Sequence, residues 1–137
     1  MANTNEIIEA IKQYQPEQDN WQGLDKLLEQ LWKTGEPSKG IGELFDVLER
    51  FPVHDGYGVF WSIVHGLEHL PDYEPFLVNS LRRQPTEFNV LMVNRVFNAG
   101  QSNVGGVNIL TLLREVLTHP KATGQAKQDA EEYIKRY

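Results

Sequence analysis

The chain has 137 residues, of which 40% are hydrophobic and 23% charged, a balance that is typical of a folded globular domain and argues against wholesale disorder. It contains no cysteine, which excludes a disulfide framework, a thiolate metal site and a cysteine nucleophile. The net charge of −6 is unevenly distributed, with 14 acidic and five basic residues through Pro75, and five acidic and eight basic residues from Phe76 onward.

The first half of the chain predicts four helices, because its apolar residues recur at helical spacing. The first helix spans about Thr4 to Tyr14, and Asn3 with Glu6 forms a capping-box pattern at its start. The second follows a cap at Asp19 or Asn20 and ends at Gly35, the third runs from Ser38 to Pro52, and the fourth covers Val59 to Leu67.

The second half predicts four more helices. The fifth follows a cap at Asp72 and has Pro75 in its first turn, the sixth runs from a cap at Thr86 to Gly100, the seventh covers Leu110 to Leu117, and the eighth opens at Thr123. Residues 98–108 contain three glycines and are the longest loop signal of the chain. A loop of this length fits either a functional segment or a disordered one.

A short sequence motif recurs at the ends of the predicted helices: LERFP at 48–52, LEHLP at 67–71, LRRQP at 81–85, and a shortened LTHP at 117–120. Proline lacks an amide donor and its ring clashes with the preceding turn, so we expect helices to end within about two residues of each of these prolines. This layout predicts an all-α fold, a single domain over residues 1–137 with about eight helices in HEAT-like antiparallel hairpins. Because the prolines are unevenly spaced, an irregular helical bundle is the alternative.

The sequence HGLEH, His65 to His69, matches the H-x-x-E-H pattern of inverse zincins on a predicted helix. Two histidines four residues apart share a helix face and are able to hold zinc, with Glu68 as general base. Such peptidases also need a third protein ligand and a substrate cleft, for which a chain of this size has little room. We therefore predict no metal site, with His65 and His69 as exposed flanks of a buried Leu67.

The sequence HDGYGVFW, His54 to Trp61, joins the third and fourth helices through two glycines. It is no phosphate-binding fingerprint, because it follows a helix and lacks a third glycine. Tyr57 and Trp61 are candidate exposed anchors beside Asp55, since tyrosine and tryptophan dominate binding hot spots. Trp61 also adjoins the apolar stripe of the fourth helix, so its favoured interpretation is burial in the core.

The remaining patterns limit the possible functions. The acidic stretch through Pro75 repels nucleic acid and attracts a basic partner, with a merely solvated surface as the alternative. The arginines are too interspersed for a nucleic-acid groove, and there is no P-loop or G-x-S-x-G motif. The first twenty residues lack the layout of a signal peptide, and no apolar run approaches a membrane span. We predict a cytoplasmic protein without enzymatic activity, cofactor, nucleic-acid partner or membrane partner.

The stretch WSIVHGLEHLPDYEPFLVNSLRRQPTEFNVLMVNRVFNAG, residues 61–100, resembles the small all-helical immunity proteins of bacterial polymorphic and contact-dependent growth inhibition toxin systems. In that family a helix ending in H-G-L-E-H-L-P is followed by one ending in R-x-P. The resemblance implies a cytoplasmic antidote that binds a cognate toxin domain, often a basic nuclease, and occludes its active site. It implies no catalytic residues and no inherited contact residues.

We therefore predict an acidic immunity protein that inhibits its toxin by stoichiometric protein–protein interaction, with a HEAT-like adaptor for an unrelated partner as the alternative. Acidic residues near the ends of the third to fifth helices would pair with basic residues of the toxin and speed the encounter. The candidate partner-binding residues are Asp46, Glu49, Asp55, Tyr57, Trp61, Glu68, Asp72 and Glu74.

Overall fold

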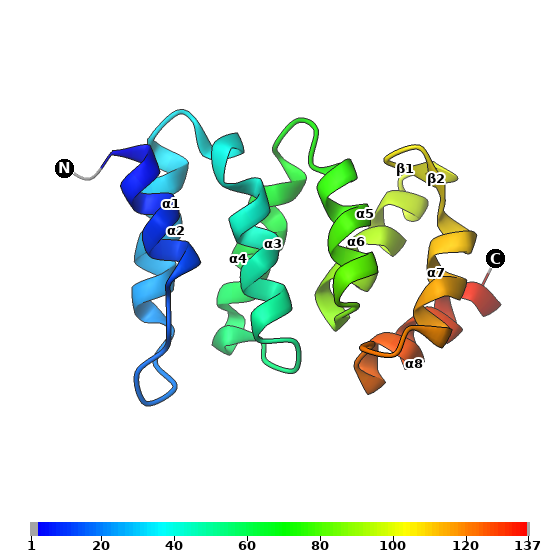
Figure 1. Ribbon diagram of the computed structural model, residues 1–137. Coiled ribbons are helices and arrows are strands. Elements are labelled where there is room, and N and C mark those ends of the chain that lie inside the picture. The colour runs from blue at the N-terminus through cyan, green and yellow to red at the C-terminus, as the bar shows by residue number, and fades with distance from the viewer. Residues whose placement is uncertain (1–2, 137) are drawn as a thin grey trace. The chain divides into compact units, whose positions relative to one another are not determined.

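The computed structural model describes residues 3–136, which divide into two compact units. Unit 1 comprises the residues up to Val47 together with His54–Tyr73, and unit 2 comprises Leu48–Val53 together with the residues from Glu74 onward. Within the described residues there are eight α-helices, two short 3₁₀ helices and one two-stranded sheet (Figure 1). The predicted all-α class and the predicted number of helices are confirmed.

Unit 1 is built on α1, α2 and α4, with α2 packing against both of the others. Its elements are α1 Thr4–Lys12, α2 Gln22–Lys33, η1 Pro37–Gly40, α3 Ile41–Arg50, η2 Gly56–Gly58 and α4 Val59–Glu68. The last three residues of α3 are counted with unit 2. The fully buried side chains of unit 1 include Ile11, Leu24, Leu28, Phe60 and Ile63. They recur at helical spacing, which is why these segments bury one face as helices.

Local capping fixes the start of α1 as predicted. The Asn3 side chain accepts a hydrogen bond from the backbone N–H of Glu6 at 2.8 Å and donates one to the Glu6 carboxylate at 2.9 Å. This reciprocal pair satisfies a backbone donor that the first turn of a helix leaves unpaired. The helix ends at Lys12, two residues before the predicted end at Tyr14.

Unit 2 contains two helix pairs in which each helix also contacts its counterpart in the other pair. Its elements are α5 Glu74–Arg83, α6 Glu87–Asn98, β1 Asn103–Val104, β2 Val107–Asn108, α7 Ile109–Thr118 and α8 Gly124–Lys135. Helix α5 packs against α6 and α7, and α8 packs against α6 and α7. Within unit 2, this is the packing expected of successive HEAT-like hairpins.

A buried hydrogen-bond network joins α5 to α6. Thr86 is the N-cap of α6, as predicted, and forms a capping box with the fully buried Asn89. The Asn89 amide also donates to the Ser80 hydroxyl at 3.2 Å and to the Gln84 carbonyl at 2.9 Å. Each of these polar groups therefore has a partner, which removes the large cost of burying it unpaired.

The helices that precede the four prolines end close to their predicted positions. Helices α3, α5 and α7 end two residues before Pro52, Pro85 and Pro120, whereas α4 ends at Glu68, three residues before Pro71. The difference arises because His69 and Leu70 form turn hydrogen bonds to Gly66 and Leu67 after the helix ends.

The segment 98–108 is not a featureless loop. It contains the β1–β2 hairpin, in which Gly105 and Gly106 have φ of 53° and 79° and form the turn. The Gly105 amide donates to the Glu74 carboxylate at 3.0 Å, and Val104 is fully buried.

None of the helices within residues 3–136 has both the length and the apolar character that a membrane span requires.

Candidate functional site

Two loops of unit 1 meet at one carboxylate. Asp19, from the loop between α1 and α2, accepts hydrogen bonds from the indole N–H of Trp21 at 3.1 Å and from His54 Nε2 at 2.9 Å on Oδ1. Its other oxygen accepts the phenolic hydroxyl of Tyr57 at 2.6 Å. We call Asp19, Trp21, His54 and Tyr57 the Asp19 cluster. Its charge-assisted bonds fasten the segment ahead of α4 to the start of α2.

Two hydrogen bonds fix the orientation of the His54 ring. Its Nδ1 accepts the backbone N–H of Gly56 at 2.7 Å, which requires a lone pair on that nitrogen. In this arrangement Nε2 is the nitrogen that donates to Asp19. Both ring nitrogens are engaged, so His54 is placed to hold the loop rather than to take a proton from a substrate.

The backbone of both loops of the Asp19 cluster is held in unfavourable conformations. Gln18, Asp19 and Tyr57 have φ of 50°, 62° and 50°, a region that residues with a Cβ seldom adopt. Each such residue costs on the order of 1–3 kcal/mol and persists only where its surroundings impose it. The Asp55 carboxylate helps to impose it by accepting the Tyr57 amide at 2.9 Å.

The strain places an aromatic ring in solvent. Tyr57 is 72% exposed although its hydroxyl is fixed by Asp19, and its ring meets His54 edge-on with centroids 5.5 Å apart. Below it, Trp21 is 3% exposed and contacts Phe60 in a T-shaped pair at 5.3 Å. An exposed tyrosine on a buried aromatic base loses little conformational freedom on binding, which suits an interface anchor.

The cluster shifts two pKa values in opposite directions. The pKa of Asp19 is lowered, chiefly because the Tyr57 hydroxyl donates to it and next because the Trp21 indole does. The pKa of Tyr57 is raised, because its proton is held by the negative charge of Asp19. The bond between them therefore requires an ionised Asp19 and a protonated Tyr57.

This bond predicts how the Tyr57 phenol titrates. The Tyr57 pKa is raised on folding, so the stability it contributes is present below the unfolded value of about 10 and is lost as the pH rises through the folded pKa. In an absorbance titration of phenolate formation, Tyr57→Phe is expected to remove a transition that lies above the ordinary tyrosine value of about 10, and Asp19→Asn is expected to shift that transition to lower pH. Loss in Tyr57→Phe of a transition at or below about pH 10 would contradict the assigned bond.

The structure separates the eight predicted partner-binding residues. Asp55, Tyr57 and Trp61 lie together around the start of α4, whereas Glu68 and Asp72 lie at or beyond its end, and Asp46 lies half-buried on α3. The other two belong to unit 2, where both already have partners. Glu49 forms two hydrogen bonds with Arg83, and Glu74 accepts the Gly105 amide.

The predicted burial of Trp61 is wrong. Its side chain is 40% exposed and lies against the His65 ring, with centroids 5.9 Å apart. The core face of α4 is filled by Phe60, Ile63 and Val64, all fully buried, so Trp61 falls beside that stripe rather than in it. Trp61 therefore remains a candidate anchor in the first turn of α4, which directly follows the η2 turn that carries Tyr57.

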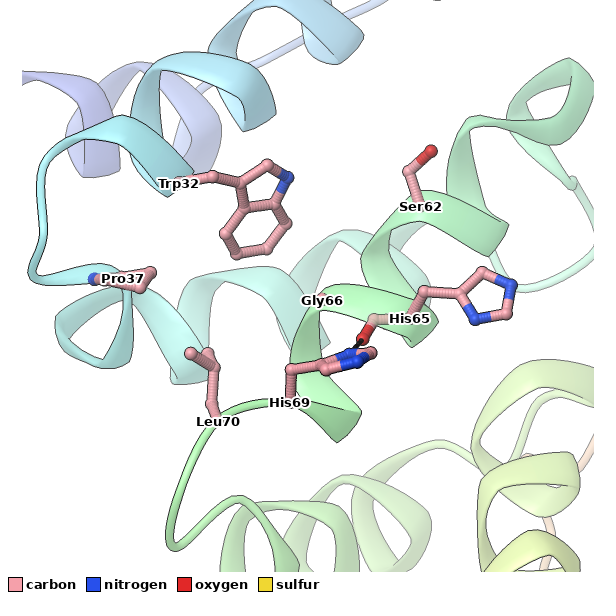
Figure 2. A pocket seen from close by; sticks show the side chains of 7 residues that line it. All are labelled: Trp32, Pro37, Ser62, His65, Gly66, His69 and Leu70. Carbon is pink, nitrogen blue, oxygen red and sulfur yellow. Dashed lines mark hydrogen bonds between the residues drawn. The ribbon is translucent and has the colours of Figure 1, made fainter.

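The HGLEH sequence forms one wall of an open groove of about 420 Å³ in unit 1 (Figure 2). The groove is lined by Trp32, Pro37, Ser62, His65, Gly66, His69 and Leu70. A Cβ on Gly66 would overlap the Trp32 ring, so the glycine permits α2 and α4 to approach. His69 Nδ1 donates to the His65 carbonyl at 2.7 Å, and the two rings diverge in Figure 2.

The geometry gives HGLEH a packing role. Within residues 3–136, no three His, Cys, Asp or Glu side chains gather in a way that would hold a metal ion. The pattern is accounted for by Gly66 beneath Trp32 and by Leu67, which is fully buried.

Asp19, Trp21 and His54 are the members of the cluster that the sequence did not reveal as site residues. The sequence offered Asp19 or Asn20 as the cap of the second helix. The Asp19 carboxylate bonds to side chains instead, and Asn20 accepts a hydrogen bond from the Gln22 amide at 3.0 Å. Comparisons of the chain with models of protein families, with curated proteins and with solved structures found no match.

Proposed function

We propose that this chain is a bacterial immunity protein that acts in the cytoplasm, where it binds a cognate toxin domain and occludes its active site. The surface that we assign to the toxin is the Asp19 cluster together with Asp55 and Trp61. The resemblance of residues 61–100 to all-helical immunity proteins of contact-dependent toxin systems suggests the class of partner.

The observation that carries the proposal is the exposed, preorganised Tyr57. A ring that is 72% exposed yet bonded through its hydroxyl is held by a residue with positive φ, and backbone strain of this kind clusters at binding sites. Trp61, 40% exposed one turn further on, adds a second large aromatic to the same end of α4. Tyrosine and tryptophan are the residues that most often carry the energy of protein interfaces.

Charge favours a basic partner. Unit 1 has 12 acidic and four basic residues, a net charge of −8, whereas unit 2 has seven acidic and nine basic residues, a net charge of +2. A toxin that grips nucleic-acid phosphates carries basic residues around its active site, and an acidic surface complements them.

The proposal is tested by growth of cells that express the toxin domain encoded beside this chain. Coexpression of the wild-type chain is expected to restore growth, and the double variant Tyr57→Ala with Trp61→Ala to restore it poorly at equal abundance. An adaptor for an unrelated partner would give no protection in either form, which would contradict the proposal.

The acidic charge of unit 1 is expected to govern the rate of association. Replacing Glu17, Asp55 and Asp72 with their amides changes the charge of unit 1 from −8 to −5. Asn at position 55 keeps an oxygen for the Tyr57 amide. Biosensor kinetics are expected to show association slowed by about threefold to tenfold at low ionic strength and less at high ionic strength, with little change in dissociation.

The matched control removes the same charge from unit 2. Amides in place of Asp129, Glu131 and Glu132 of α8 are expected to slow association less than the variant of unit 1 does. Equal slowing by both triple variants would mean that the net charge of the chain, and not the acidic charge of unit 1, steers the partner.

A further inference from the structure

A second groove lies in unit 2, and most of the charged side chains that line it are basic. Its volume is about 530 Å³, and four cationic side chains line it together with a single carboxylate. Arg50 comes from the end of α3, Arg82 and Arg83 from the end of α5, and Lys121 from the turn after α7. We call these four residues with Glu49 the basic groove.

The wall of the basic groove is fixed by hydrogen bonds between α5 and the turn after α7. His119 Nε2 donates to the Arg82 carbonyl at 2.6 Å, and His119 Nδ1 accepts the Lys121 amide at 3.1 Å. The Gln84 side chain donates to the Lys121 carbonyl at 2.6 Å. Arg82 and Lys121 are thereby mounted on one rigid frame, which lowers the entropy lost when a ligand binds both.

Two carboxylates orient the arginines. Glu115 accepts from Nε and Nη2 of Arg82 at 3.1 and 3.3 Å, and Glu49 accepts from Nε and Nη2 of Arg83 at 2.8 and 2.9 Å. A guanidinium has a second edge, formed by Nη1 and Nη2, that is able to take another carboxylate in the same paired geometry. Within residues 3–136, Nη1 of Arg82 and the ammonium of Lys121 make no hydrogen bond or ion pair, whereas Nη2 of Arg82 is shared with Glu115.

We propose that the basic groove binds a short acidic segment of a partner protein, with Arg82 and Lys121 as its main contacts. This site is separate from the Asp19 cluster and does not depend on the function proposed above.

Carboxylates fit the groove better than nucleic-acid phosphates do. Unit 2 has a net charge of only +2 within a chain of −6, which is too little for the many phosphate contacts on which nucleic-acid affinity depends. Glu49 lies in the wall of the groove and Glu115 beside it, and both already show the paired geometry in which these arginines bind a carboxylate.

The test is fluorescence anisotropy of a labelled hexaglutamate peptide titrated with the full chain at low ionic strength. Saturable binding is expected, and Arg82→Gln with Lys121→Gln is expected to weaken it by about tenfold. The matched control, Arg114→Gln with Lys127→Gln, removes two exposed cations of unit 2 from outside the groove and is expected to change the affinity less than about twofold.

Cations near helix C-termini also stabilise helices, so unfolding midpoints are compared for all variants. Lys121→Gln alone removes no hydrogen bond of the described residues and keeps the test valid if the double variant is unstable. The proposal is overturned if the wild type does not bind the peptide, if the control variant loses as much affinity as the groove variant, or if inorganic phosphate or single-stranded DNA displaces the labelled peptide more effectively than unlabelled hexaglutamate does.

Discussion

Tyr57→Ala is expected to speed dissociation of the proposed toxin complex by about 30-fold, which corresponds to the loss of about 2 kcal/mol at a central interface anchor. The ring is 72% exposed before binding, so its removal costs unit 1 little of its own packing. Association is expected to change much less, because a neutral side chain contributes little to long-range attraction. Biosensor kinetics with the purified toxin domain measure both rates.

Two further variants separate the ring from its positioning bond. Tyr57→Phe keeps the ring but removes the hydroxyl that bonds to Asp19, so it is expected to fall between the wild type and the alanine variant. Phe76→Ala removes a 44% exposed aromatic from unit 2 and serves as the matched control, with an unchanged dissociation rate. Equal acceleration by Phe76→Ala and Tyr57→Ala would contradict the assignment of the Tyr57 surface.

Gly66→Ala is expected to destabilise the fold, because its methyl group would overlap the Trp32 ring across the α2–α4 contact. Overpacking of this kind costs about 1–3 kcal/mol, which outweighs the gain of up to about 1 kcal/mol from replacing a helical glycine with alanine. Urea denaturation is expected to show a lower midpoint for Gly66→Ala at an unchanged slope.

Two comparisons isolate the contact with Trp32. Gly124→Ala introduces the same methyl group into α8 where no atom lies within 4 Å, and it is expected to leave stability unchanged or raise it. In a Trp32→Ala background, Gly66→Ala is expected to become neutral or stabilising, since the overlapping ring is gone. A cost for Gly66→Ala that persists without Trp32 would show that the ring is not the cause.

The helices and several of their caps were predictable because their signals are local. Asn3, Thr86 and Thr123 each accept a hydrogen bond from an amide three residues on, and each precedes an apolar stripe of helical period. The hairpin at 103–108 also had a local signal, a Gly-Gly pair between two valines, which was interpreted only as a loop.

The candidate site was predictable only in part, because its bonds join distant positions. Asp19 is 35 residues from His54 and 38 residues from Tyr57, and no spacing rule connects such positions in a single sequence. The role of Gly66 likewise depends on Trp32, which lies on another helix. Whether Trp61 is buried or exposed depended on the width of the apolar face of α4. Helical periodicity does not decide the burial of a residue at the edge of such a face.

Hydrogen exchange of the chain, alone and in complex with the proposed toxin domain, tests the proposed mode of action most directly. The proposal predicts that toxin binding slows amide exchange in residues 17–22 and 54–61, the two segments that form the Asp19 cluster and its neighbours. Unchanged exchange in both segments, with protection confined to unit 2, would contradict it.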